Sequence, residues 1–333
     1  MLVERTHTIL VAPLLCLALF TVHVQAAIRP IPPTSPTGFT RGSDGSLWFL
    51  QAGGYIGHVA LDGTITTEYR IPAKRNGIAS DADGSLWFSG VGYQIYRIDR
   101  AGQITQFDTP TVDSQPGHIV RVGDYFWFAE SEAGKIGRID RDGHITEYPI
   151  PTASGMPWSI AADRAGNIWF TELRASKIGR LGHDGTIIEF ELPGKGPHEI
   201  ALGADGNLWF TEYQNGAIGR IDADGTIAEF ALPSGNCYPQ SITLGEDGNM
   251  WFAELGGMNW NRIGRITPAG AVTEWSLPGE QTYPSDIISG PAGDLWFGEY
   301  ERGMIGRITT SGKITEYAIA PLRETRVVPA DPD

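Results

Sequence analysis

The feature that most constrains the fold is a sevenfold internal repeat. A Trp-Phe pair recurs at intervals of 39, 40, 42, 40, 42 and 45 residues, with its tryptophan at Trp48, Trp87, Trp127, Trp169, Trp209, Trp251 and Trp296. A regular period of this length is typical of solenoids and propellers, in which each repeat is one supersecondary unit. The whole fold is therefore expected to consist of seven copies of one unit.

Each copy carries the same four short phrases, which are clearest in the fifth. They are His198-Glu-Ile-Ala-Leu-Gly, Asn207-Leu-Trp-Phe-Thr-Glu, Ala217-Ile-Gly-Arg-Ile and Thr226-Ile-Ala-Glu-Phe-Ala-Leu-Pro. The phrases are rich in β-branched and aromatic residues and are separated by Gly- or Pro-containing turns, which predicts strands joined in hairpins. The 43 glycines and 22 prolines among 333 residues also disfavour a helical protein. We expect an all-β fold, a seven-bladed β-propeller of four-stranded antiparallel blades.

Several recurring residues are expected to be structural. The aromatic pairs would fill the wedge between neighbouring blades, and the glycine of the Ile-Gly-Arg phrase would let the adjacent blade approach closely. Ring closure has two solutions: residues 27–36 add an outer strand to the last blade, or residues 313–319 already form that strand.

The first 26 residues have the pattern of a secretory signal peptide. Arg5 precedes an apolar run over residues 9–22 that is broken by Pro13, and Val24-Gln25-Ala26 then offers the small residues that a signal peptidase recognises. Cleavage would leave Cys237 as the only cysteine, so no intrachain disulfide is expected. We expect a periplasmic or secreted protein.

The remaining chain divides simply. Residues 27–36 form an N-terminal segment or closure strand, residues 37–321 the propeller, and residues 322–333 a polar tail.

The charge balance narrows the choice of partner. Lys and Arg number 25 against 39 Asp and Glu, a formal net charge of -14, which opposes binding to nucleic acid or, after signal cleavage, to an anionic membrane. A small molecule or cyclic peptide is the expected ligand. A closed ring leaves few exposed strand edges, so we expect a monomer.

Hairpin geometry predicts where a site would lie. The first hairpin of the fifth blade turns at Asp205, so antiparallel pairing brings His198 opposite Glu212 at one mouth of the central channel. The same rule collects the glutamates Glu130, Glu172, Glu212, Glu254 and Glu299 at one level. The matching positions at the strand starts hold Gly117 or His118, Trp158, His198, Gln240 and Ser285.

The predicted ring of carboxylates has two interpretations. Converging carboxylates repel one another unless a cation or protons neutralise them, and oxygen-rich rings suit Mg²⁺ or, as an alternative, Ca²⁺. The five blades also carry an arginine in the next strand, so an ordinary ion pair within each blade would explain the pattern without a ligand. These arginines are Arg138, Arg180, Arg220, Arg265 and Arg307.

Two histidines are predicted at the channel mouth, His118 and His198, whereas His58, His144 and His183 fall on outer strands or turns. A histidine oriented by a glutamate is a suitable general base near neutral pH. The alternative for His198 is a structural hydrogen bond to a backbone carbonyl. No serine-nucleophile elbow, paired-cysteine zinc motif or phosphate loop occurs in a usable context.

The repeated phrases carry a family resemblance. Leu-Trp-Phe-Thr-Glu, Ile-Gly-Arg-Ile and Ile-Thr-Glu-Tyr, running from about residue 37 to 321, resemble the virginiamycin B lyase (streptogramin lyase) family of seven-bladed propellers. The resemblance implies an elimination that opens the lactone ring of type B streptogramins with Mg²⁺ and a histidine base. In that chemistry the metal polarises the ester carbonyl and the base removes the proton α to the threonyl carbonyl.

The family's active phrase is only partly present. Where the family has Glu-Pro-His, this chain has Tyr283-Pro284-Ser285, while Glu299 matches the family's second metal ligand and Gln240 the position of a substrate-contacting histidine. A Pro-His phrase with its glutamate occurs two blades earlier, at His198 and Glu212.

The resemblance and the spacing together predict the following site. His198 is the catalytic base; the metal ligands are Glu212, Glu254 and Glu299; the substrate contacts are His118, Gln240, Tyr283 and Ser285. The alternatives are a non-catalytic ligand-binding or protein-interaction scaffold and a calcium-dependent lactone hydrolase.

Overall fold

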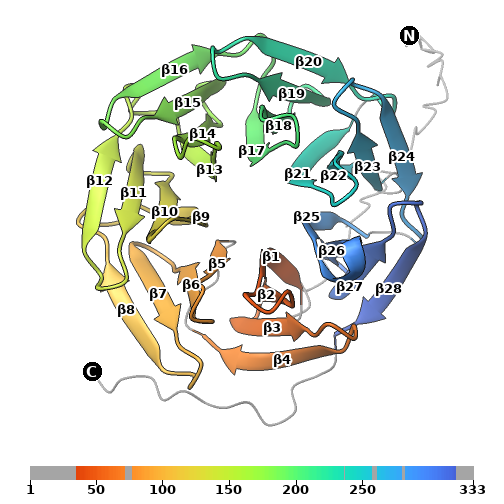
Figure 1. The fold of residues 1–333 in the computed structure, drawn as a ribbon, viewed down its shortest axis with the longest axis horizontal. Helices are drawn as coiled ribbons and strands as arrows, with labels where there is room; N and C mark the ends of the chain where they lie inside the picture. Colours follow the sequence, from red (N-terminus) through yellow and green to blue (C-terminus); the bar gives the residue numbers. More distant parts are fainter. Residues whose placement is uncertain (1–34, 72–76, 236, 257–260, 280–281, 320–333) are drawn as a thin grey trace, which may run out of the picture. The chain divides into compact units, whose positions relative to one another are not determined.

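Seven four-stranded antiparallel sheets make up the described part of the chain. The computed structural model describes residues 35–71, 77–235, 237–256, 261–279 and 282–319. In these ranges each sheet has its strands in sequence order, and the sheets are arranged as blades around a central axis (Figure 1). The predicted all-β, seven-bladed propeller is confirmed.

The first four blades occupy the chain up to residue 191. Blade one contains β1 (Pro36–Arg41), β2 (Leu47–Gln51), β3 (Tyr55–Val59) and β4 (Ile65–Arg70). Blade two contains β5 (Ile78–Ser80), β6 (Leu86–Ser89), β7 (Gln94–Ile98) and β8 (Ile104–Asp108). Blade three contains β9 (Pro116–Val122), β10 (Tyr125–Glu130), β11 (Lys135–Ile139) and β12 (Ile145–Pro149). Blade four contains β13 (Pro157–Ala162), β14 (Ile168–Glu172), β15 (Lys177–Leu181) and β16 (Ile187–Glu191).

The last three blades complete the ring. Blade five contains β17 (Pro197–Leu202), β18 (Leu208–Glu212), β19 (Ala217–Ile221) and β20 (Ile227–Ala231). Blade six contains β21 (Tyr238–Leu244), β22 (Met250–Leu255), β23 (Arg262–Ile266) and β24 (Val272–Ser276). Blade seven contains β25 (Pro284–Ser289), β26 (Leu295–Glu299), β27 (Met304–Ile308) and β28 (Ile314–Ala318), with a 3₁₀ turn, η1 (Pro291–Gly293), in its first hairpin.

Ring closure uses contacts between blades one and seven. The outer strand of blade seven is β28, as one of the two closure predictions had it. The Phe39 amide of β1 donates to Asp286 Oδ2 of β25 at 2.9 Å, and the Ser285 hydroxyl donates to the Pro36 carbonyl at 3.0 Å. Each blade is therefore one contiguous segment of chain, and the first and last blades are joined by side-chain hydrogen bonds.

Three predicted segments lie partly or wholly outside the described residues. They are the signal peptide, the N-terminal segment up to residue 34, and the tail at residues 322–333. Within the described ranges, no helix has the length and apolar character needed to cross a bilayer.

The core lies between the blades. Leu50 and Ile56 of blade one, for example, form one cluster with Phe88 of blade two. Five of the seven repeat tryptophans are almost completely buried, while Trp48 and Trp127 keep partial exposure. The structural role predicted for the aromatic pairs is confirmed, because buried rings of this size fill the gap that radial packing leaves.

The repeat glycine has a different purpose from the one predicted. A Cβ on Gly219 would lie 2.1 Å from the ring of Phe210, its cross-strand partner in the same blade. Five other repeats have the same clash at the equivalent glycine, Gly57, Gly137, Gly179, Gly264 and Gly306. The glycine therefore makes room for the phenylalanine of its own blade rather than for the neighbouring blade.

The repeat arginines also differ from the prediction. Arg180 lies 5.4 Å from the centre of the Trp169 ring and Arg220 lies 5.4 Å from that of Trp209, which is cation–π geometry. Arg220 also approaches Asp205 of the first hairpin at 3.9 Å. The ion pair expected between these arginines and the strand-two glutamates is wrong, because antiparallel register sets each arginine beside the tryptophan instead.

Candidate functional site

The inner strands start around one cavity of about 610 Å³ at the propeller axis. Its lining comes from the first residues of the inner strands and from the ends of the second strands: Thr37, Ala52, Gly117, His118, Ser131, Trp158, Ser159, His198, Glu199, Gln240, Leu255, Tyr283, Pro284, Ser285, Asp286 and Tyr300. A concave, mostly apolar space with a few polar groups is typical of ligand sites. The structure therefore brings His198 together with the four predicted substrate contacts, His118, Gln240, Tyr283 and Ser285.

A β-bulge alters the predicted partner of His198. Pro197 pairs with Glu212 and Ile200 pairs with Phe210, so two residues of β17 occupy the space opposite one residue of β18. The extra residue places His198 and Glu199 together at the cavity. The prediction that His198 faces Glu212 is wrong, because plain hairpin arithmetic does not include the bulge.

The predicted ring of glutamates does not line the cavity. Glu130, Glu172, Glu212, Glu254 and Glu299 are all completely buried, and none of them is among the cavity's described lining residues. The physical reason is that each glutamate pairs with the proline at the start of the inner strand, which lies between it and the axis (Figure 1), whereas the following residue, such as Ser131 or Leu255, reaches the cavity. Their side chains lie inside the blades.

Each buried glutamate has a second carboxylate from the outer strand of its own blade as a neighbour. For Glu130, burial and the charge of Glu147 raise the pKa to about 8. Burial likewise raises the pKa of Glu299 to about 8, with Glu316 adding to the effect, and that of Glu212 to about 7. A raised pKa means that these carboxyls hold protons near neutral pH.

The predicted metal ligands do not fit a shared cation. Glu212 accepts a hydrogen bond from the Asn215 side chain at 2.7 Å, and Arg302 Nη1 lies 2.8 Å from Glu299 Oε2. Glu254 pairs with Arg262 at 3.3 Å in a third blade. The three carboxyls therefore have separate partners in separate blades, and no shared Mg²⁺ or Ca²⁺ site can be built from them in this geometry.

His198 is held with one ring nitrogen free. Its Nδ1 lies 2.9 Å from the Gln240 carbonyl, which only accepts, so Nδ1 carries the proton and Nε2 has the lone pair. The Trp158 and Tyr213 rings lie 5.3 and 5.7 Å from the imidazole. Burial lowers the pKa of His198, so the ring is neutral near pH 7 and its Nε2 can accept a proton. The carbonyl bond, considered as the structural alternative, is present and at the same time fixes the tautomer of a base.

His118 has the opposite tautomer. Its Nδ1 accepts the Ile160 backbone N–H at 3.3 Å, which leaves the proton on Nε2. That nitrogen lies 4.0 Å from Glu199 Oε1. Burial lowers the pKa of His118 to about 4. The histidine–carboxylate pair of the cavity is therefore His118 with Glu199 rather than His198 with Glu212, and only His198 has a free lone pair.

Sequence reasoning missed the second residue of the inner-strand phrase. In blades four to seven, Ser159, Glu199, Ser241 and Asp286 occupy this position, and each of these side chains takes part in bonds between neighbouring inner strands. In blade three the position holds His118, which was predicted. The Ser159 hydroxyl accepts the Ile200 amide at 3.3 Å and the Ser241 hydroxyl accepts the Ile287 amide at 3.1 Å. A signal was present, because the phrase Pro-x-x-Ile recurs in blades three to seven with two residues between the proline and the isoleucine.

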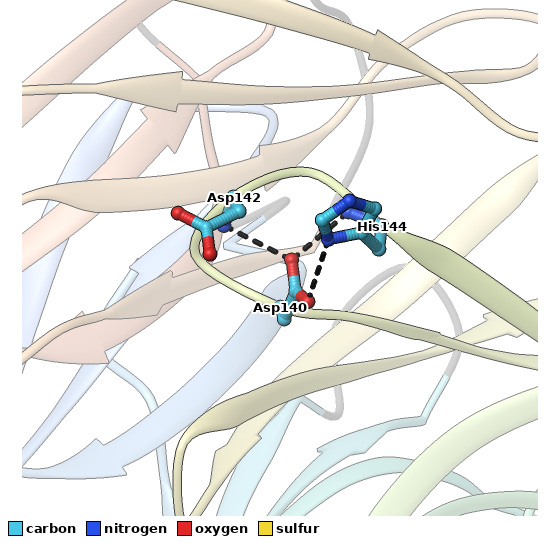
Figure 2. A group of neighbouring side chains, drawn as sticks. All are labelled: Asp140, Asp142 and His144. Carbon is cyan, nitrogen blue, oxygen red and sulfur yellow. Dashed lines mark hydrogen bonds and ion pairs between the residues drawn. The ribbon is translucent and has the colours of Figure 1, made fainter.

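One further group has metal-ligand chemistry but lies away from the cavity. Asp140, Asp142 and His144 are clustered in the turn between β11 and β12 (Figure 2). Asp140 Oδ1 accepts the backbone amides of Asp142 and His144 at 3.0 and 2.9 Å, and the His144 side chain is 81% exposed. The hydrogen bonds of an Asx turn account for this arrangement. The surface position predicted for His144 is confirmed.

The comparison with protein families identifies the chain's relatives. The family described as "Virginiamycin B lyase family" matches residues 22–208 and 160–328, which is most of the chain. The chain belongs to the virginiamycin B lyase family.

Individual relatives agree with this assignment. The chain is 37% identical over 119 residues to the virginiamycin B lyase of Nocardia farcinica (strain IFM 10152), a match that covers 35% of this chain and 42% of that relative. A streptogramin B lyase structure is 34% identical, with a TM-score of 0.68 over 88% of this chain and 86% of that one. A catalytically inactive His-to-Ala variant of the virginiamycin B lyase from Staphylococcus aureus, solved with quinupristin, is 41% identical, with a TM-score of 0.70 over 73% of this chain and 83% of that one.

The virginiamycin B lyase family assignment agrees with the propeller and with the placement of polar residues at the axis. The alignment with the Nocardia relative spans less than half of that relative's length.

Proposed function

We propose that this protein is a virginiamycin B lyase-like enzyme, a carbon–oxygen lyase that opens a cyclic lactone or depsipeptide of the type B streptogramin class in the axial cavity. The observation that carries the proposal is the state of His198: its Nδ1–H is bonded to the Gln240 carbonyl, and its unprotonated Nε2 belongs to a residue that lines the cavity. A neutral imidazole with a fixed tautomer is suited to remove a proton from carbon next to a carbonyl group.

The cavity suits a ligand of this kind. Its volume of about 610 Å³ lies within the range of small-molecule sites. Trp158, Tyr283 and Tyr300 give it aromatic walls, on which the aromatic and aliphatic side chains of a cyclic peptide can pack. Gln240, Tyr283, Ser285 and His118 are the polar groups that we propose as its substrate contacts.

A direct assay tests the proposal. Purified protein is incubated with a type B streptogramin such as quinupristin, with Mg²⁺ in one series and with EDTA in another, and the product is analysed by mass spectrometry. Elimination yields a linear product of unchanged mass, whereas hydrolysis adds the mass of one water molecule. We expect the linear product of unchanged mass.

Substitution of the base makes the assay specific. His198→Gln should lower kcat by about 100-fold or more, the usual contribution of a general base. His144→Gln, the same change at a side chain that is 81% exposed, should leave kcat unchanged. Wild-type turnover that survives His198→Gln would refute the assignment of this base.

A non-catalytic scaffold is the second candidate. It is favoured by the separation of Glu212, Glu254 and Glu299, which removes the predicted metal cluster from the cavity. Calorimetric binding of the intact antibiotic without any conversion would support this second function.

The cellular location and the oligomeric state are also proposals. We propose export with cleavage after Ala26, tested by sequencing the mature N-terminus, and a monomer, tested by light scattering.

A further inference from the structure

The bulge in β17 puts two chemically different side chains next to each other at the cavity. His198 and Glu199 are consecutive, both lie between the paired residues Pro197 and Ile200, and both line the cavity. Consecutive residues of a regular strand face opposite sides, so only the bulge allows this arrangement. A base and an acid group thereby share one ligand space.

The surroundings of Glu199 contain a second carboxylate and no cation. From β25, Asp286 lines the same cavity; from β9, His118 Nε2 lies 4.0 Å from Glu199 Oε1; from β21, Ser241 donates its hydroxyl to Asp286 Oδ1 at 2.7 Å. The described lining residues include no lysine or arginine. The repulsion between the two carboxyl groups is therefore relieved by protonation of one of them.

Burial, charge and hydrogen bonds together decide which carboxyl holds that proton. Glu199 accepts the Ile242 backbone amide and shares the Ser241 hydroxyl with Asp286. Asp286 accepts from the Ser241 hydroxyl and, at 2.9 Å, from the Phe39 backbone amide, so its charged form is well supported. Burial and the charge of Asp286 raise the pKa of Glu199 well above its ordinary value, whereas that of Asp286 is raised to about 6. Near neutral pH, Asp286 is ionised and Glu199 is a carboxylic acid.

We propose that Glu199 is the acid group of the cavity reaction and donates an O–H hydrogen bond to the carboxylate that leaves when His198 removes the α proton. This assignment rests on the proposed lyase function. His198 Nε2 takes the proton from the carbon α to the threonyl carbonyl, and the C–H electron pair forms the new carbon–carbon double bond. The carbon–oxygen bond of the lactone breaks, its electron pair passes to the carboxylate, and the Glu199 O–H donates a hydrogen bond to this developing charge while keeping its proton. His198 then returns its proton to solvent.

The acid occupies the role that the family resemblance gives to a metal. A neutral carboxylic acid held in an apolar site can donate a strong hydrogen bond to developing negative charge. Because the glutamates predicted as metal ligands are enclosed in three separate blades, the positive charge at the leaving group would come from the Glu199 O–H. We expect turnover that does not require a divalent cation.

The conservative substitution Glu199→Gln separates the effect of the acidic O–H from that of structure. Glutamine keeps the size, the carbonyl oxygen and the ability to accept the Ile242 backbone amide, one of the hydrogen bonds that Glu199 makes, but its amide is a weaker hydrogen-bond donor than a carboxylic acid and does not ionise. Glu132→Gln is the matched control, since Glu132 is half exposed and lies on the turn after β10. Circular dichroism and calorimetric binding of quinupristin establish that each variant is folded and binds.

The decisive measurement is steady-state turnover of a type B streptogramin in EDTA between pH 5 and pH 10. We expect Glu199→Gln to lower kcat by about 100-fold with little change in KM, and to abolish the decline of kcat at alkaline pH that follows ionisation of Glu199 in the wild type. Glu132→Gln should match the wild type in both respects.

Three results would overturn the assignment. If Glu199→Gln turns over the antibiotic nearly as fast as the wild type, Glu199 is not the acid group of the reaction. Wild-type turnover that stops in EDTA and returns with Mg²⁺ leaves the lyase function standing and makes a metal, not Glu199, the electrophile. Absence of wild-type turnover under both conditions refutes the proposed function, and the role of Glu199 with it.

Discussion

Glu130 offers the sharpest test of the electrostatics inside a blade. Its side chain is completely buried at the end of β10, and neither carboxyl oxygen has a hydrogen-bond partner. Beside it, Glu147 is ionised and satisfied, since it accepts from Lys135 at 2.5 Å and from the backbone amide and hydroxyl of Thr111. Lys135 therefore neutralises Glu147, and Glu130 holds a proton.

The sign of the resulting pH dependence follows from the raised pKa. Unfolded Glu130 would titrate near its ordinary value of 4.5, whereas burial and Glu147 raise its pKa in the folded chain to about 8. Between these values the folded state binds the proton and the unfolded state does not, so the free energy of unfolding falls as pH rises. From pH 4.5 to pH 7 this is about 2.5 pH units at about 1.4 kcal/mol each, or about 3 kcal/mol.

The substitution Glu130→Gln removes this dependence, because glutamine resembles the protonated acid and cannot ionise. Near pH 5 the variant should have nearly the stability of the wild type, and by pH 8 it should be more stable by about 4 kcal/mol. Guanidinium unfolding at pH 5, 6, 7 and 8 measures the difference. Glu132→Gln, two residues further along and half exposed, is the control and should follow the wild type at every pH.

The reasoning would be refuted by parallel pH profiles. If the difference in unfolding free energy between Glu130→Gln and the wild type stays constant from pH 5 to pH 8, Glu130 is not protonated in the folded chain. If Glu130→Gln instead becomes less stable than the wild type as pH rises, the ionised carboxylate of wild-type Glu130 has a stabilising partner in the folded chain.

Two other substitutions test the packing inside a blade and the ion pairs that Asp81 makes with the next blade. Gly219→Ala should lower the unfolding free energy by about 1–3 kcal/mol, because the new methyl group would lie 2.1 Å from Phe210; Gly117→Ala, where the nearest atom is 3.8 Å away, should be tolerated. Asp81→Asn should cost about 1–3 kcal/mol at pH 7 in thermal or guanidinium unfolding, because buried Asp81 accepts from Arg141 at 2.7 Å and pairs with Arg121 at 3.1 Å. The Arg141 hydrogen bond lowers the pKa of Asp81, so the stability that ionised Asp81 contributes should decline progressively as pH falls below about 4. An Asn variant whose destabilisation stays the same at low pH would contradict this.

The architecture could be predicted from the sequence because the pattern that encodes one blade occurs seven times. A single Trp-Phe pair is compatible with many folds, but seven copies at nearly constant spacing, each with four strand phrases, leave little choice. Even the outer strand of the last blade followed from the repeated Ile-Thr-Glu-Tyr phrase, which forms β28. Repetition supplies independent evidence for each element, which a unique segment does not have.

The site was predicted less well because it depends on local irregularity. The level of the inner-strand starts was correct, so His118, His198, Gln240 and Ser285 do meet at one cavity. The predicted pairing of His198 with Glu212 was wrong, because one extra residue in the bulge moves Glu199, rather than Glu212, to the cavity. Glutamates on the second strand share the repeat's periodicity with the tryptophans, and periodicity alone does not distinguish a buried carboxyl from one that lines a channel.

Blade seven shows why family resemblance also misplaced the chemistry. The resemblance assigns the base to the position of Ser285, but here its hydroxyl donates to the Pro36 carbonyl and helps to close the ring. It assigns a metal ligand to Glu299, but here Arg302 lies 2.8 Å from Glu299 and 2.6 Å from Glu316, so one guanidinium already binds both carboxyl groups. Because every blade repeats the same inner-strand geometry, His198 in blade five can present an imidazole to the same cavity from a different direction. A ligand held against this base would have to be rotated about the propeller axis relative to one held against blade seven, and the near-sevenfold symmetry of the backbone is what makes such a rotation compatible with one fold.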